Sequence, residues 1–171
     1  PEFAEAHAQL GLALLSRIHF GGLPKQDQVA LAEPAIKRAL KLKPELSEAY
    51  EALGLLERYR NIRSVAAIEA AYETAIKLNP NNASALRTFG LFKCLERHQP
   101  EQALPLVNRA RFLDPHNHHT LGLLGQVLMA LERFEESKEV LNAAIDSNPN
   151  SAPSYVFLGN LHYAKLYQFD K

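Results

Sequence analysis

Apolar and small side chains recur along this chain at intervals of three and four residues, which is the spacing of one face of an α-helix. Within residues 150–164 this stripe comprises Tyr155, Leu158, Gly159 and His162. A second helical stripe, within residues 134–149, comprises Leu141, Ala144 and Ile145. It ends at Pro149, because the residue before a proline is pushed out of the helical region. The pattern therefore predicts pairs of helices, each pair joined by a short loop and followed by a turn.

The helix pair repeats, and each copy is marked by one glycine and one proline. The glycines are Gly11, Gly54, Gly90, Gly125 and Gly159, and the prolines ten residues before them are Pro1, Pro44, Pro80, Pro115 and Pro149. Consecutive glycines are 43, 36, 35 and 34 residues apart, so all the variation in repeat length falls between a glycine and the next proline, where we expect a loop. A glycine inside a helix costs about 1 kcal/mol relative to alanine, so we also expect each one to permit close helix packing.

These residues resemble the tetratricopeptide repeat family, in which each repeat has a first helix, A, and a second helix, B. The family's pattern is a large apolar residue, Leu, Gly and an aromatic on helix A, then Ala, an aromatic, Ala and Pro along helix B. In the fourth repeat the corresponding residues are Leu121, Leu124, Gly125, Leu128, Ser137, Leu141, Ala144 and Pro149. The resemblance implies an all-α solenoid of helix-turn-helix repeats, wound into a right-handed superhelix, with four repeats, a final A helix and about nine helices.

The resemblance covers the whole chain, which we therefore interpret as a single array over residues 1–171. The repeats fall approximately at 4–44, 47–80, 83–115 and 118–149, and a half repeat occupies 152–171. Because the chain opens on Pro1 and its only methionine is Met129, we expect it to be a fragment of a longer protein.

Two departures from the family pattern carry structural expectations. Residues 17–28 lengthen the connection between the helices of the first repeat, and their glycines and proline are turn residues, so we expect a loop there. This loop is either a tolerated surface insertion or a flap that brings His19 and Phe20 to a ligand. Glu57 and Lys93 occupy the position where the family prefers an aromatic, so we expect those ends of the A helices to be more solvated than usual.

Charge and composition exclude several classes of partner. Nineteen basic residues balance nineteen acidic ones, so the chain lacks the positive charge that binds nucleic acid or an anionic membrane surface. No run approaches eighteen consecutive apolar residues, so we expect no insertion into a membrane. The single cysteine, Cys94, excludes a disulfide within the chain and fits the cytoplasm, which we slightly favour, or the periplasm.

The sequence carries no pattern of catalytic or cofactor chemistry. It has no glycine-rich phosphate loop, nucleophile elbow or catalytic carboxylate pair, so we expect neither an enzyme nor a cofactor. His116, His118 and His119 are close in sequence, and clustered histidines can bind zinc. Three ligands within four residues of a turn cannot easily surround one ion, so we predict no metal site. Cys94 is either a nucleophile or, as we favour, a small apolar side chain.

By resemblance, the concave wall of the solenoid is lined by A-helix residues three and two positions before each repeat glycine and one, four and five positions after it. The wall residues that we select as candidates for binding are Gln9, Leu12, Leu15, Glu51, Leu55, Arg58, Tyr59, Arg87, Thr88, Leu91, Leu95, Leu123, Gln126, Met129, Phe157, Asn160 and Tyr163. The apolar positions, together with the amides of Gln126 and Asn160, suit an apolar segment held by a few hydrogen bonds. We therefore predict a non-enzymatic protein–protein interaction module that holds a peptide, a helix or a sister domain in this groove.

Two alternatives stay open. Some of the wall leucines can instead pack between adjacent A helices. The array can also be a homo-oligomerising scaffold whose groove and ends contact other copies. Because residues 165–171 are too short to supply a further B helix, we expect the final A helix to leave an apolar strip uncovered and to self-associate through Tyr155, Leu158 and Leu166.

Overall fold

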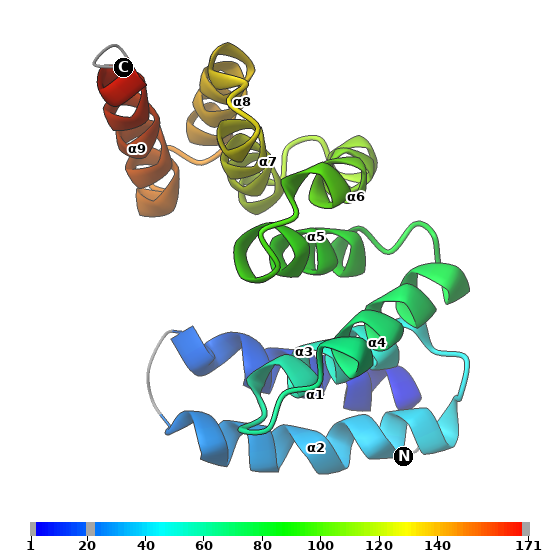
Figure 1. Ribbon diagram of the computed structural model, residues 1–171. Coiled ribbons are helices and arrows are strands. Elements are labelled where there is room, and N and C mark those ends of the chain that lie inside the picture. The colour runs from blue at the N-terminus through cyan, green and yellow to red at the C-terminus, as the bar shows by residue number, and fades with distance from the viewer. Residues whose placement is uncertain (1–2, 20–22, 169–171) are drawn as a thin grey trace. The chain divides into compact units, whose positions relative to one another are not determined.

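The computed structural model describes the backbone of residues 3–19 and 23–168 (Figure 1). This part of the chain contains nine α-helices, one 3₁₀ turn, one π-helical turn and no β-strand, so the all-α prediction is confirmed. None of these helices combines the length and the apolar character needed to span a lipid bilayer. The chain divides into two compact units, Pro1–Ala85 and Leu86–Lys171.

The first unit is built from two pairs of helices. Its elements are α1 (Ala4–Ser16), the 3₁₀ turn η1 (Arg17–His19), α2 (Lys25–Leu42), α3 (Ser47–Tyr59) and α4 (Val65–Leu78). In each pair the A helix packs along its B helix, α1 on α2 and α3 on α4, and the two A helices also pack on each other. Leu15, Ile36 and Leu56 are fully buried between α1, α2 and α3. This is the stacking that the repeat pattern predicts.

The second unit continues the same order of elements. They are α5 (Ala83–Leu91), which begins in the last residues of the first unit, the π-helical turn η2 (Phe92–Glu96), α6 (Pro100–Leu113), α7 (His118–Ala130), α8 (Phe134–Ser147) and α9 (Ala152–Gln168). Helix α7 packs on α6 and α8, and α9 packs on α7 and α8. Val107, Leu124 and Val127 lie at the centre of its hydrophobic core.

Asparagine side chains hold the turns between repeats. Asn79 and Asn148 directly follow the ends of α4 and α8, and each side-chain oxygen accepts a hydrogen bond from the backbone N–H two residues later, at 3.0 and 3.2 Å. These Asx turns reverse the chain at the Asn-Pro step. Asn82 and Asn117 then cap α5 and α7, because their side-chain oxygens accept from the backbone N–H three residues later, at 2.9 and 3.1 Å.

The insertion in the first repeat is accommodated partly by a longer helix. Helix α2 has 18 residues, whereas α4, α6 and α8 each have 14. Residues 25–28, which we predicted as part of a loop, are therefore helical. Phe20 lies outside the described residues, as does the side chain of His19, so the predicted flap stays a prediction.

The third repeat places its extra residue inside its A helix, which corrects the prediction that a loop absorbs it. From Phe92 to Glu96 the backbone is π-helical, and the N–H of Arg97 donates to the carbonyl of Phe92, five residues back, at 3.1 Å. A π turn holds one residue more than an α turn, which matches a repeat length of 35 residues against 34 in the fourth repeat. After the π turn the backbone enters the left-handed region at His98 (φ 53°). Glu132 (φ 58°), which follows α7, adopts the same conformation.

The π turn also changes which side chains after Gly90 face the core. Cys94 lies in the hydrophobic core of the second unit, although regular helical spacing places it on the wall. Cys94 is therefore a core side chain, and its burial raises the pKa of the thiol, which the charge of Glu101 raises further. Lys93, which we expected to be solvated, is only 9% exposed, and its ammonium lies 5.1 Å from the centroid of the Phe89 ring.

Four of the repeat glycines lie where a B-helix side chain crosses the A helix. The pairs in contact are Gly11 with Ile36, Gly54 with Tyr72, Gly90 with Val107 and Gly125 with Leu141. A Cβ atom added at any of these glycines would lie only 2.5 to 2.9 Å from the partner side chain. A Cβ atom added at Gly159 would have no atom within 4 Å beyond its own stretch of helix, since no B helix follows α9 in the described part of the chain. The predicted close packing is thus confirmed wherever a B helix is present.

Alanine substitutions separate these two environments. Gly125→Ala is expected to lower the free energy of unfolding by about 1–3 kcal/mol, because the added methyl group overlaps Leu141. Gly159→Ala is expected to raise it by about 0.5–1 kcal/mol, because there is space for the methyl group and alanine is the better helix former. Urea unfolding followed by circular dichroism measures both, and a shift of the same sign in both variants would contradict the packing argument.

Candidate functional site

A cavity of about 140 Å³ opens in the second unit between the A helices α5, α7 and α9, and we call it the A-helix groove. Five of the predicted wall residues line it, namely Arg87, Leu91, Leu123, Gln126 and Phe157. They come from three successive A helices. The repeat therefore brings side chains that are far apart in the sequence to one site.

Part of the lining is apolar. Leu123 is almost fully buried and belongs to the core of the second unit, whereas Leu91 and Phe157 are half-buried. The Phe157 ring lies beside Gly122, where an added Cβ atom would lie 3.4 Å from it, an ordinary van der Waals contact. These side chains offer a partner an apolar surface that is already partly shielded from water.

Two histidines at the start of α7 add titratable groups to the groove. The rings of His118 and His119 lie 4.0 Å apart between centroids, and Nε2 of His118 lies 3.3 Å from Nδ2 of Asn148. Burial lowers the pKa of His119, and the neighbouring His118 and the positive charge of Arg87 lower it further. The free protein therefore favours the neutral form of His119.

The start of α9 completes the lining with Ser151, Pro153 and Ser154. Both serines are buried, and the Ser154 hydroxyl donates to the Ser151 hydroxyl oxygen at 3.0 Å. Our sequence rule missed these residues and the two histidines, because it begins three positions before each repeat glycine. Extending the same helical stripe back by one turn would have found His118, His119, Pro153 and Ser154, whereas Ser151 lies just before α9.

In the first unit, several predicted wall residues are structural. Leu15 and Leu55 lie in a hydrophobic core cluster and are 0% and 7% exposed. These two wall leucines therefore pack between helices, as the alternative interpretation expected. Glu51 is also buried, and its carboxylate accepts hydrogen bonds from the Ser84 hydroxyl at 2.6 Å and the Asn82 amide at 3.2 Å. These three side chains are held inside the fold and are not free to meet a ligand.

The other wall residues of the first unit lie nearer the surface. Gln9 is exposed, and Leu12 is half-buried against the core. Tyr59 is half-buried, and the Arg58 guanidinium lies 5.7 Å from its ring centroid. Tyr59 also lines a cavity of about 270 Å³ beside α2, so it faces the B helix of the preceding repeat.

The remaining wall residues of the second unit do not line the A-helix groove. Thr88 is buried and Met129 is half-buried. Leu95, Asn160 and Tyr163 are exposed. Leu95 lies within the π turn, which rotates it away from the position that regular helical spacing would give it.

Comparison with known families identifies this architecture. Two models of the tetratricopeptide repeat family match the sequence, one over residues 25–86 and the other over residues 94–156. The chain belongs to the tetratricopeptide repeat family. No curated protein matches the sequence significantly.

Solved structures of low sequence identity share the fold of this tetratricopeptide repeat chain. Pseudomonas aeruginosa PilF aligns with a TM-score of 0.77 and 22% identity, over 96% of this chain and 69% of that chain. PilW, described as a widely conserved type IV pilus biogenesis factor, aligns with a TM-score of 0.73 and 17% identity, over 96% and 74%. YrrB, described as having an unusual peptide-binding site, aligns with a TM-score of 0.66 and 19% identity, over 96% and 78%. At these identities the likeness shows the fold alone.

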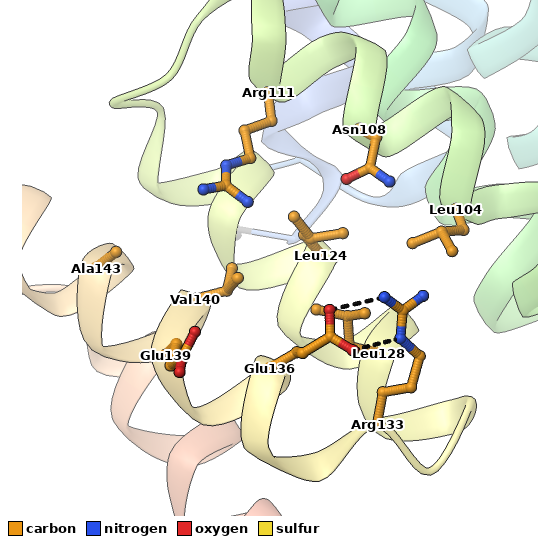
Figure 2. Close-up of a pocket in the computed structure, with 10 residues that line it drawn as sticks. All are labelled: Leu104, Asn108, Arg111, Leu124, Leu128, Arg133, Glu136, Glu139, Val140 and Ala143. Atoms are coloured by element: carbon orange, nitrogen blue, oxygen red, sulfur yellow. Dashed lines mark hydrogen bonds and ion pairs between the residues drawn. The ribbon is translucent and has the colours of Figure 1, made fainter.

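The tetratricopeptide repeat chain has another cavity in its second unit, between α6, α7 and α8, with a volume of about 280 Å³ (Figure 2). We call it the B-helix cavity. Arg133 donates two hydrogen bonds to Glu136, Nε to Oε1 and Nη2 to Oε2, both at 2.7 Å, and this contact lowers the pKa of the Glu136 carboxyl. Arg111 and Glu139 add one charge of each sign, so the lining is balanced in charge. The sequence analysis considered only A-helix walls and missed it.

Among the side chains that the structure describes, no group of three or more His, Cys, Asp or Glu residues is arranged to hold a metal ion. His118 and His119 line the A-helix groove. His116 lies in the turn before them, where its backbone carbonyl accepts a hydrogen bond from the Ser147 hydroxyl.

Burial separates structural wall residues from accessible ones. Leu55→Ala is expected to lower the free energy of unfolding by about 2–4 kcal/mol, because it opens a void in the core cluster of the first unit. Gln126→Ala is expected to change it by no more than about 0.5 kcal/mol, because that amide is only half-buried and faces the groove. Equilibrium unfolding in urea compares the two variants. If Leu55→Ala left the free energy of unfolding nearly unchanged, Leu55 would belong to the accessible wall and not to the core.

Proposed function

We propose that this tetratricopeptide repeat chain is a non-enzymatic protein-interaction module that holds a peptide segment in the A-helix groove. Proteins of this family generally act as interaction modules, and Cys94, the one thiol of the chain, is buried with a raised pKa. The observation that carries the proposal is the groove itself. It gathers wall residues of three successive A helices around an open cavity.

The size of the groove favours a peptide side chain over a free small molecule. Its volume of about 140 Å³ is below the roughly 300 Å³ at which small-molecule pockets begin. A segment of a protein partner can place one apolar side chain against Leu91 and Phe157 while its backbone continues along the wall. The Gln126 amide lies in the same lining and can donate and accept hydrogen bonds with that backbone.

Selection from a displayed random-peptide library tests this function. Enriched peptides are expected to bind the wild-type chain, and Phe157→Ala is expected to weaken them by at least about tenfold, because it removes an aromatic anchor from the groove. Isothermal titration calorimetry measures the affinities.

Phe112→Ala is the matched control, because Phe112 is an aromatic of α6 that is 72% exposed and lines neither cavity in the described part of the second unit. Its peptide affinities are expected to equal those of the wild type. The proposed function would be overturned if the selected peptides bound Phe157→Ala as tightly as the wild-type chain, or if the library yielded no binder.

The second candidate function is self-association through α9, and the open environment of Gly159 favours it. The four other repeat glycines are covered by a B-helix side chain, whereas Gly159 is uncovered. Of the residues that we expected in this contact, Tyr155 is 50% exposed and Leu158 is half-buried, while the side chain of Leu166 lies outside the described residues. Val156 on the same helix is 57% exposed. A second copy could cover this strip with its own α9.

Sedimentation velocity over a wide range of concentrations tests this candidate. The wild-type chain is expected to associate as its concentration rises, and Tyr155→Asp with Val156→Asp is expected to leave it monomeric, because charges replace the apolar contact. Phe112→Asp, on an exposed site of α6, is the control and is expected to associate like the wild type. A wild-type chain that stays at 19.1 kDa throughout would exclude the candidate.

A further inference from the structure

The B-helix cavity is a second site with its own chemistry, and it shares no lining residue with the A-helix groove. We propose that it binds a free α-amino acid with an apolar side chain. In this site the α-carboxylate of the ligand lies against Arg111, its α-ammonium lies against Glu139, and its side chain lies on the apolar floor of the cavity. Because the site is separate from the peptide groove, the inference goes beyond the proposed function.

The cavity forms because the two B helices of the second unit stand apart. Helices α6 and α8 both pack on α7, but they hardly contact each other. One helical stripe of each B helix faces the space between them, and these stripes comprise Leu104, Asn108 and Arg111 on α6 and Glu136, Val140 and Ala143 on α8. The volume of about 280 Å³ lies near the lower limit of roughly 300 Å³ for small-molecule pockets, so the cavity suits a ligand of the size of an amino acid.

The floor of the cavity is apolar and already formed. Leu124, Leu128 and Val140 are buried in the core of the second unit, and Leu104 is half-buried against them. Core packing holds these side chains in place without a ligand. An apolar side chain that covers this floor is removed from water without a rearrangement of the core, which favours its binding.

Two of the four charged side chains in the lining are paired with each other, and the other two are not. Arg133 and Glu136 are joined by two hydrogen bonds of 2.7 Å. Arg111, Glu139 and the amide of Asn108 have no hydrogen-bond or ion-pair partner among the residues that the structure describes. The cavity therefore keeps one cation and one anion that a ligand can contact.

The unpaired charges come from opposite sides of the cavity. Figure 2 shows Arg111 and Asn108 extending from α6 toward Leu124, with Glu139 on α8 across from them. A ligand between the two B helices thus meets a cation on one side and an anion on the other. The complementary ligand carries both charges and has no net charge.

These groups select a zwitterion. A guanidinium can donate two parallel hydrogen bonds to one carboxylate, and a glutamate carboxylate accepts hydrogen bonds from an ammonium group. An acid without an ammonium group meets a like charge at Glu139, and an amine without a carboxylate meets a like charge at Arg111. A free α-amino acid carries both groups on one carbon atom. In a protein segment both are consumed in peptide bonds, so the lining favours the free amino acid.

The experiment uses L-leucine as the probe, together with three analogues that each lack one of the recognised groups. Leucinamide lacks the carboxylate, isocaproate lacks the ammonium group, and glycine lacks the apolar side chain. The titrations are run at about pH 6.5, where an α-amino group such as that of leucinamide stays protonated. The wild-type chain is expected to bind leucine at least about tenfold more tightly than each analogue. Chemical-shift titration by NMR measures these affinities, and the shifts are expected in α6 and α8.

Two charge variants assign the two ends of the ligand. Arg111→Gln is expected to reduce the preference for leucine over leucinamide to less than about threefold, because the mutant no longer binds the carboxylate. Glu139→Gln is expected to do the same to the preference over isocaproate. Arg109→Gln and Glu135→Gln make the same changes of charge on α6 and α8 outside the lining, so both are matched controls and are expected to keep both preferences.

Filling the cavity gives a readout that does not depend on charge. Ala143 is exposed and lines the cavity, so Ala143→Phe is expected to occupy the space and to weaken leucine binding by at least about tenfold. Phe157→Ala alters the A-helix groove and is expected to leave leucine binding unchanged. The test of this cavity is therefore independent of the test of the peptide groove.

Several outcomes would contradict the inference. It fails if millimolar leucine causes no chemical-shift change, or if the changes fall on the A-helix groove instead of α6 and α8. It fails if N-acetyl-leucinamide, which represents a leucine within a protein segment, binds as tightly as leucine. It also fails if Arg109→Gln lowers the preference over leucinamide as much as Arg111→Gln does. Each of these results leaves the proposed peptide groove untouched.

Discussion

The contact between a B-helix side chain and the glycine of its A helix is the constraint from which the geometry of each repeat follows. Ile36, Tyr72, Val107 and Leu141 reach to within 2.5–2.9 Å of the place where a Cβ atom would stand. Any other residue at the glycine would push the two helices apart. This close approach fixes which face of the A helix is turned toward its B helix, and so it also fixes which face remains for a wall. Wall residues can be counted from the glycine because the glycine defines the orientation of the helix.

That orientation holds only as far as the helix stays regular. In the third repeat the π turn from Phe92 to Glu96 shifts every later side chain relative to Gly90. The A-helix groove accordingly uses Arg87 and Leu91, which precede the turn, whereas Cys94 enters the core. One inserted residue thus changes the composition of the wall without lengthening any loop.

The electrostatic character of the groove arises from this local arrangement. A neutral chain argues against nucleic acid and anionic membranes as partners, but the net charge says nothing about where the charges lie. The two cavities of the second unit differ in this respect. In the B-helix cavity Arg133 pairs with Glu136, whereas the A-helix groove is lined by Arg87 and two histidines.

The sequence by itself determined the helix pairs, their order, the family and the close packing at the repeat glycines. These properties depend on periodicity and on residues with narrow conformational or steric roles, such as the Asn-Pro turns and Gly125, so they can be recognised without knowing what lies across the fold. The candidate site was predicted in part, since Arg87, Leu91, Leu123, Gln126 and Phe157 do converge.

Only the tertiary structure decided which wall residues stay accessible. Leu15, Leu55 and Glu51 occupy wall positions by spacing, yet the neighbouring helices and the residues around Asn82 cover them. His118, His119 and Ser151 lie outside the counted positions and nevertheless complete the groove. Burial and cavity lining depend on contacts between segments that are distant in the sequence, whereas the repeat pattern reflects only the packing of each helix on its nearest neighbours.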